Sequence, residues 1–175
     1  MKGKVACEIS TADELLATEL MFTGIYNDLS VAHCVALISC LVFNEKSTSD
    51  KSPHKITTSE LELPYKQLQQ CATHIAQCIS NSGQQIDIDE YVNTYQSDLI
   101  DVVYSWCQGH KFSDICKLTD IFEGSIIRAL RRLEELLRQY ANAANAIGNN
   151  ELEVKFTAGI ELLKRDIVFA ASLYL

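Results

Sequence analysis

Residues 112–139 read FSDICKLTDIFEGSIIRALRRLEELLRQ, and this stretch decides the fold. Its hydrophobic spacing predicts a short helix, a tight turn and then a long helix with two unlike faces. At about 100° per residue, one face of the long helix collects an apolar stripe formed by Ile126, Leu130, Leu133, Leu137, Tyr140, Ala144 and Ile147. This stripe should pack into a core, which leaves the opposite face to meet solvent or a partner.

The opposite face of the long helix carries Arg128, Arg132, Glu135 and Gln139. Guanidinium groups in line on a rigid helix can hold phosphates or stack on bases, and a carboxylate and an amide beside them can form hydrogen bonds at base edges. These four residues are therefore the candidate nucleic-acid contacts of the chain.

A second interpretation of the same face is a solvent-exposed ladder of weak ion pairs. Glu135 lies three or four residues from Arg131, Arg132 and Arg138, and residues at that spacing are neighbours on a helix surface. Exposed pairs of this kind contribute little to stability. The residues alone leave both interpretations open.

Length, composition and charge narrow the class of protein. The chain has 175 residues, 47% of them apolar, with two prolines and seven glycines, which predicts one helical domain over residues 1–175. The net charge is -8, and an acidic chain does not offer the broad basic surface of an autonomous nucleic-acid binder. Any contact with nucleic acid should therefore be local and assisted by neighbouring domains. No apolar stretch reaches the length of a membrane span, and we expect no membrane partner.

Seven cysteines are spread along the chain without a C-x-x-C pair, as expected for reduced core residues. The nearest approach to a metal constellation is Cys71, His74 and Cys78 on one side of a predicted helix. This spacing is not a recognised zinc pattern and has no evident fourth ligand. We therefore expect no metal centre.

Helix signals occur along most of the remaining sequence. Thr11 with Glu14 forms a capping box, Ser30 and Ser97 are caps, and Gly148 marks the end of the long helix. The predicted elements are an extended start at residues 4–9, helices at about 11–24, 30–43, 61–80 and 97–109, a short helix from Asp87 or Asp89 to about residue 95, a mobile polar loop at 44–59, and a last helix from Asn149 or Asn150 that packs antiparallel to the long helix. Together these signals predict an all-α bundle of about seven or eight helices.

Motifs of enzyme active sites are missing from the sequence. It contains no G-x-x-x-x-G-K-[ST] phosphate loop, no G-x-G-x-x-G turn, no G-x-S-x-G elbow and no H-E-x-x-H helix. We therefore expect no catalytic residues and no bound cofactor in the chain itself.

Several ordered segments carry a family resemblance. MKGKVACEIS, DELLATELMFTG, DLIDVVYSWC, the stretch at 112–139, AIGN and LLKRDIVFAASLYL occur in this order. With them the chain closely resembles the DSHCT domain, the C-terminal helical module of superkiller-like DExH-box RNA helicases. The sequence is most similar to the nuclear branch of exosome-cofactor helicases. The resemblance covers essentially the whole chain except residues 44 to about 62.

The resemblance implies a helical bundle that lies against two RecA-like domains and a winged-helix domain of a parent helicase. In that family the long helix is a ratchet helix that lines the channel for single-stranded RNA. The resemblance implies that Arg132 and Glu135 face the channel. It also implies that Arg128 and Gln139, on the same face, are RNA-binding neighbours.

The resemblance also implies the setting in which the domain works. The parent would be an ATP-dependent 3′-to-5′ RNA helicase acting with the nuclear RNA exosome and its adaptor proteins in RNA processing and decay, with ATP and Mg in the helicase core. Its location would be the nucleolus or nucleoplasm, or the cytoplasm if the chain belongs to the cytosolic superkiller branch.

Two alternatives from other functional classes remain. The polar faces would serve a protein-docking scaffold equally well, because docking also needs ordered polar side chains on a rigid helix. The short helix, turn and basic helix at 112–139 also match the pattern of a helix-turn-helix DNA-binding module, although the net acidity counts against it.

Overall fold

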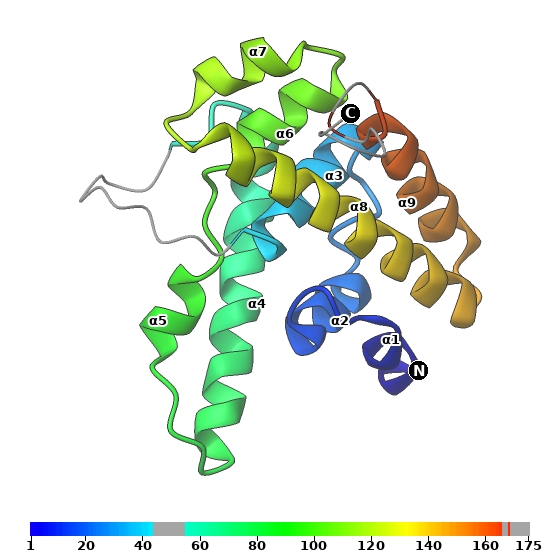
Figure 1. The fold of residues 1–175 in the computed structure, drawn as a ribbon. Helices are drawn as coiled ribbons and strands as arrows, with labels where there is room; N and C mark the ends of the chain where they lie inside the picture. The colour runs from blue at the N-terminus through cyan, green and yellow to red at the C-terminus, as the bar shows by residue number, and fades with distance from the viewer. Residues whose placement is uncertain (44–54, 166–167, 169–175) are drawn as a thin grey trace.

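The computed structural model describes residues 1–43, 55–165 and 168. These residues fold into helices joined by short turns, with no strand among them (Figure 1). None of the described helices is both long and apolar enough to cross a membrane. The helices are α1 (Lys2–Glu8), α2 (Glu14–Thr23), α3 (Val31–Ile38), α4 (Glu62–Asn81), α5 (Ile88–Asn93), α6 (Ile100–Cys107), α7 (Phe112–Ile115), α8 (Glu123–Ala146) and α9 (Asn150–Leu163), with 3-10 turns η1 (Ser39–Leu41), η2 (Ser59–Leu61) and η3 (Cys116–Leu118). The predicted all-α fold is confirmed.

The long helix α8 and the last helix α9 form the antiparallel pair that the sequence predicts (Figure 1). Gly148 has φ 75°, a left-handed conformation that ends α8 and that a residue with a Cβ adopts less easily. Asn149 then begins α9, because its Oδ1 accepts a hydrogen bond from the backbone N–H of Leu152 at 3.1 Å. The short turn sends α9 back along α8.

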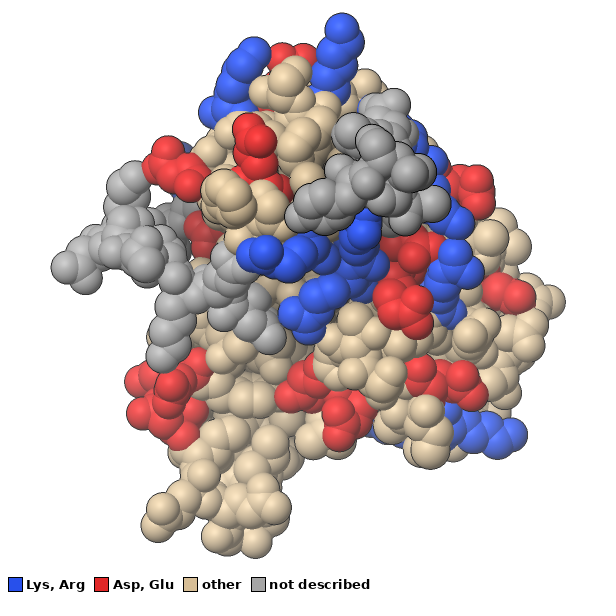
Figure 2. Space-filling model, viewed as in Figure 1, with Lys and Arg blue, Asp and Glu red and all other residues tan. Residues whose placement is uncertain are grey.

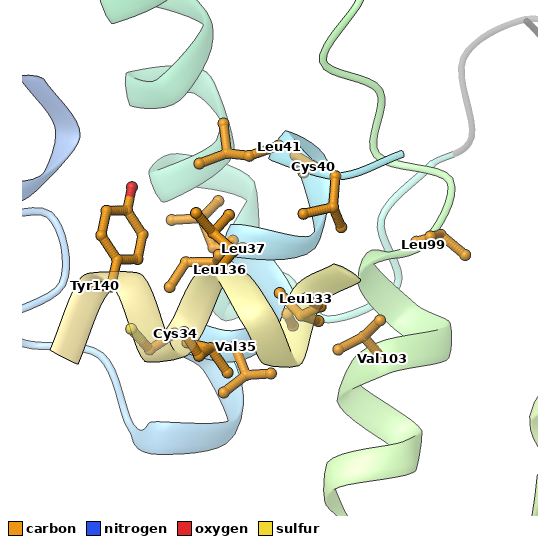
Figure 3. Packing of buried hydrophobic residues seen from close by; sticks show 14 of the residues in the cluster. Cys34, Val35, Leu37, Cys40, Leu41, Leu99, Val103, Leu133, Leu136 and Tyr140 are labelled. Carbon is orange, nitrogen blue, oxygen red and sulfur yellow. The ribbon is translucent and has the colours of Figure 1, made fainter. Parts of the chain in front are cut away.

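The centre of the core lies between α8 and α3. Figure 3 shows Leu133, Leu136 and Tyr140 of α8 together with Val35 and Leu37 of α3, and all five side chains are no more than 1% exposed. Burying a side chain of this size stabilises the fold by about 1.5–3 kcal/mol. One side of α8 is therefore committed to the core, as its apolar stripe predicts.

The start of the chain differs from the prediction. Residues 2–8 form α1 rather than an extended segment. The helix packs against α2 and α8 and fully buries Val5. A seven-residue helix is too short to be stable through its own propensity, so its packing decides the conformation.

The second helix begins two residues later than the predicted capping box at Thr11. The cap is Asp13, whose Oδ1 accepts hydrogen bonds from the backbone N–H groups of Leu15 at 2.9 Å and Leu16 at 3.0 Å. Its Oδ2 accepts a hydrogen bond from the Tyr91 hydroxyl at 2.8 Å. One carboxylate thus begins α2 and ties it to α5.

The predicted mobile loop at 44–59 lies mostly outside the described residues, which resume at Lys55. Its described end is held by Asp101 of α6, a carboxylate only 7% exposed. Asp101 accepts hydrogen bonds from the backbone N–H groups of Thr57 at 2.9 Å and Thr58 at 3.1 Å, and from the Thr58 hydroxyl at 2.9 Å. This end of the segment is therefore fixed to α6.

The C-terminal ends of α6 and α9 meet at Trp106. The ring is fully buried, and its Nε1 donates a hydrogen bond to the carbonyl of Leu163 at 3.1 Å. The Arg165 guanidinium lies 3.7 Å from the ring centroid and donates to the carbonyls of Trp106 and His110. A cation near the end of α6 also compensates the negative pole of the helix.

Candidate RNA-binding face of α8

The outward face of α8 carries a row of charged side chains. Arg128, Arg131, Arg132 and Glu135 are exposed, whereas the other side of the helix is core. Figure 2 shows basic side chains gathered over α8 with acidic ones beside them. The helix has 24 residues, and at 1.5 Å per residue it is about 36 Å long. The charged row therefore lies on a long helix whose other side is held in the core.

Each arginine of the row is oriented by a hydrogen bond within the domain. Arg128 Nη2 donates to Ser125 Oγ at 3.0 Å, and Arg131 Nε donates to the Val168 carbonyl at 2.9 Å. Arg132 Nη2 donates to a backbone carbonyl at 3.2 Å. A guanidinium has five N–H donors, so the bond that orients Arg132 leaves donors for a phosphate or a base.

The ion-pair ladder expected around Glu135 does not form among the described residues. Arg138 Nε pairs with Glu134 Oε1 at 2.5 Å, and Lys164 Nζ lies 3.9 Å from the same oxygen. Glu135 instead accepts a hydrogen bond from Gln139 Nε2 at 3.4 Å. The solvated-ladder interpretation therefore applies to the Glu134 side of the helix and not to Glu135.

The expectation that Gln139 faces outward is wrong. Its side chain is only 9% exposed, because the loop between α1 and α2 covers this turn of α8. Its Oε1 accepts hydrogen bonds from the backbone N–H groups of Ser10 at 2.9 Å and Thr11 at 3.1 Å. The structure thus brings Arg128, Arg132 and Glu135 together on the exposed face and places Gln139 beneath it.

Two features beside this face were missed in the sequence. Arg131 is exposed next to Arg132, but its spacing had suggested only a partner for Glu135. The loop residues Ser10 and Thr11 lie against α8 more than 120 residues away in sequence. Periodicity along α8 contains no signal for such a distant contact.

Metal-binding groups do not gather in the described part of the chain. No cluster of three or more His, Cys, Asp or Glu residues there is placed to hold a metal ion. Cys78 Sγ lies 3.7 Å from His74 Nε2 on α4, while Cys71 is half-buried and its burial raises the pKa of its thiol. Cys71 therefore belongs to the packing of α4.

The helix-turn-helix pattern is present only in outline. The first helix, α7, has four residues, whereas the second, α8, begins with Glu123–Ile127, which contains no basic residue. In a DNA-reading module the first residues of the second helix contact base edges. The basic residues of α8 instead lie further along, on its exposed side.

Comparison with known proteins finds one matching domain family and several similar proteins. The family described as "DSHCT (NUC185) domain" matches residues 1–170. The human exosome RNA helicase MTR4 is 55% identical over 175 residues, which are 100% of this chain and 16% of that protein.

More distant relatives show the same coverage. The ATP-dependent RNA helicase mtr4 of Schizosaccharomyces pombe is 51% identical over all of this chain and 15% of its own length, and the DExH-box ATP-dependent RNA helicase DExH9 of Arabidopsis thaliana is 45% identical over all of this chain and 17% of its own length. The chain spans about a sixth of the length of these relatives. From its first residue to residue 170, it belongs to the DSHCT (NUC185) domain family.

Proposed function

We propose that this chain is the helical domain of an ATP-dependent 3′-to-5′ RNA helicase that acts with the RNA exosome, and that the exposed face of α8 contacts the translocating single strand. The observation that carries this proposal is that Arg128, Arg132 and Glu135 of the row are exposed on a rigid helix in a domain of net charge -8. Basic side chains concentrated on one helix of an acidic domain favour a local contact with a polyanion. The names of the relatives support RNA as that polyanion.

The chemistry of the row suits a single strand. Arg132 and Arg128 can stack on bases or bind phosphates, and Glu135 can accept hydrogen bonds from base amino groups. Base edges that Glu135 could contact are accessible in unpaired RNA and are largely hidden in an A-form duplex, so this carboxylate favours a single strand. The row would hold each base briefly while the strand moves past.

The energy for movement comes from outside this chain. The sequence contains no phosphate-binding loop, so we assign ATP and Mg²⁺ to the RecA-like domains of the parent protein. Those domains, a winged-helix domain, the exosome and its adaptor proteins are the proposed partners, and the nucleus is the proposed location. The role of α8 is to guide the strand.

The experiment compares the full-length helicase with a variant carrying Arg132→Ala and Glu135→Ala. Both side chains are exposed, so the unfolding free energy should change by less than about 0.5 kcal/mol. Loss of a stacked or hydrogen-bonded contact, about 1–3 kcal/mol, should slow strand displacement on a duplex with a single-stranded 3′ tail or alter the preference for tail sequence. ATPase activity, measured in the same tubes, should be largely retained.

A charge-matched control is available on α7 and on the turn η3 that follows it. Asp114 and Lys117 form an exposed pair at 3.1 Å, and replacing both with alanine removes one acidic and one basic group away from α8. This control should unwind like the unmodified helicase. If the Arg132 and Glu135 variant also unwinds normally on every tail sequence, the docking scaffold becomes the better account of the domain.

A further inference from the structure

Gln139 makes five side-chain hydrogen bonds although it was expected to face RNA. Its Oε1 accepts from the backbone N–H groups of Ser10 and Thr11, and its Nε2 donates to Ser10 Oγ at 3.1 Å, Thr11 Oγ1 at 2.7 Å and Glu135 Oε1 at 3.4 Å. Backbone N–H groups can only donate, so the orientation of the amide is fixed by its partners. Its hydrogen-bonding capacity is filled within the domain.

The same loop holds Arg132. The Thr11 carbonyl accepts a hydrogen bond from Arg132 Nη2 at 3.2 Å, while the Thr11 N–H and hydroxyl are bonded to Gln139. Gln139 is therefore linked to Arg132 by hydrogen bonds through Thr11, and it is hydrogen-bonded directly to Glu135. The two exposed side chains of the proposed RNA contact share one buried anchor.

We propose that Gln139 is a positioning residue, which fixes the loop Ser10–Thr11 against α8 so that Arg132 is presented to single-stranded RNA in one arrangement. This inference rests on the proposed function of α8. A long arginine side chain samples many rotamers in solvent, and holding it in advance reduces the entropy lost on binding. Gln139 contributes to RNA handling without touching RNA.

A purely structural clamp makes a different prediction from a positioning residue. A clamp would change stability alone, and any effect on unwinding would combine independently with the effect of removing Arg132. A positioning residue acts through Arg132, so its effect should disappear once the arginine is gone. Non-additivity in the unwinding rate is therefore the deciding observation.

The test uses the full-length helicase with Gln139→Met, Arg132→Ala and the two combined. Methionine keeps the length of the side chain but removes every hydrogen bond to the loop. Each single variant should slow strand displacement by roughly fivefold or more, the range for a lost base contact, with ATPase retained. The combined variant should be no slower than Arg132→Ala.

Tyr140→Phe is the matched control, because it removes a buried hydroxyl that donates to the Ala17 carbonyl at 3.0 Å on the next position of the same helix. It should leave unwinding unchanged. If Gln139→Met does not fold, Thr11→Val replaces it, since the side chain is only partly buried and the carbonyl that holds Arg132 remains. It should produce a smaller slowing that vanishes in the Arg132→Ala background.

The outcomes separate the two proposals. If Arg132→Ala slows unwinding but Gln139→Met does not, or if their effects multiply, the positioning role is overturned and the RNA face stands. If Arg132→Ala itself leaves unwinding unchanged, the RNA face is overturned and the positioning role with it. Slowing by both without further loss in the combination supports the positioning role.

Discussion

At the scale of single residues, Gly159 marks a close approach of α9 to α3 and α8. A Cβ at this position would lie 2.6 Å from Val35 Cγ2 and 3.4 Å from Leu137 Cδ1. Valine in a helix has one strongly preferred rotamer, so its methyl group cannot move aside easily. The absence of a side chain at Gly159 therefore sets the distance between these helices.

We predict that Gly159→Ala destabilises the domain although alanine is the better helix former. Overpacking a core costs about 1–3 kcal/mol, which exceeds the gain of about 0.8–1.0 kcal/mol in helix propensity. Urea unfolding measures the difference. Gly3→Ala in α1, where an added Cβ meets nothing within 4 Å, is the control and should be neutral or stabilising. A more stable Gly159→Ala variant would contradict the close approach.

The buried cysteines give the stability a dependence on pH. Burial raises the pKa of the Cys34 and Cys107 thiols to about 12 in the folded protein, compared with about 8.5 in an unfolded chain. The folded state therefore keeps these protons to higher pH than the unfolded state does. Their contribution to stability is complete below about pH 8.5 and is lost as the pH rises toward 12.

We predict that the unfolding free energy falls steadily above about pH 8.5, measured by urea titration at a series of pH values. The Cys34→Ala variant should show a smaller fall, because one of the buried thiols is missing. Thiol reagents should modify the exposed Cys7 and Cys78 in the native domain and reach Cys34 only after unfolding. Equal reaction rates for all three would contradict the described burial.

At the scale of elements, the sequence predicted the long helices and some of the helix ends, but the caps expected at Thr11 and Ser97 do not form, because α2 begins after Asp13 and α6 after Leu99. Ser30 and Gly24 begin and end helices as expected, because caps depend on local backbone geometry. Helix α1 was missed because its conformation depends on packing against α2 and α8.

The candidate site could also be predicted only in part from the sequence. Periodicity gives the angle of a side chain around a helix, and it placed Arg128, Arg132 and Glu135 on the exposed face correctly. It does not reveal what lies opposite each turn. Gln139 is one heptad after Arg132 and shares its angle, yet a loop from residues 10–11 covers it.

The link between the segment before η2 and helix α6 leads to a further prediction. Asp101 accepts three hydrogen bonds from Thr57 and Thr58, two of them from backbone groups. We predict that Asp101→Ala lowers the unfolding free energy by about 1–3 kcal/mol, because three part-buried hydrogen bonds to a charged acceptor are lost. Glu161→Ala, which removes an exposed carboxylate on α9, should change it by less than about 0.5 kcal/mol. Equal effects in urea unfolding would show that the Asp101 contacts contribute nothing.

At the scale of the whole molecule, net charge opposes the local basic row. The chain carries a charge of -8, so its overall field repels RNA even though α8 presents arginines. The proposed contact therefore depends on a channel completed by other domains. An isolated domain should be a poor RNA binder.

We predict that the isolated chain binds a labelled single-stranded oligoribonucleotide no more tightly than about 10⁻⁴ M near physiological salt. Three arginines releasing counterions from three phosphates would give a slope of log affinity against log salt of about -2, at 0.7 per phosphate. Fluorescence anisotropy across a salt series measures both quantities. Micromolar binding with a much steeper slope would indicate a broader basic surface than the described residues provide.

The contact between the ends of α6 and α9 has a consequence for the fluorescence of the domain. Trp106 is the one tryptophan in the sequence, so the fluorescence of the domain reports on a single place. Its ring is shielded from water, and its N–H is bonded to the last turn of α9. Emission should lie toward the blue in the folded state and move to the red when α9 leaves α6. The domain thus carries its own optical probe for the undocking of its C-terminal helix, without any added label.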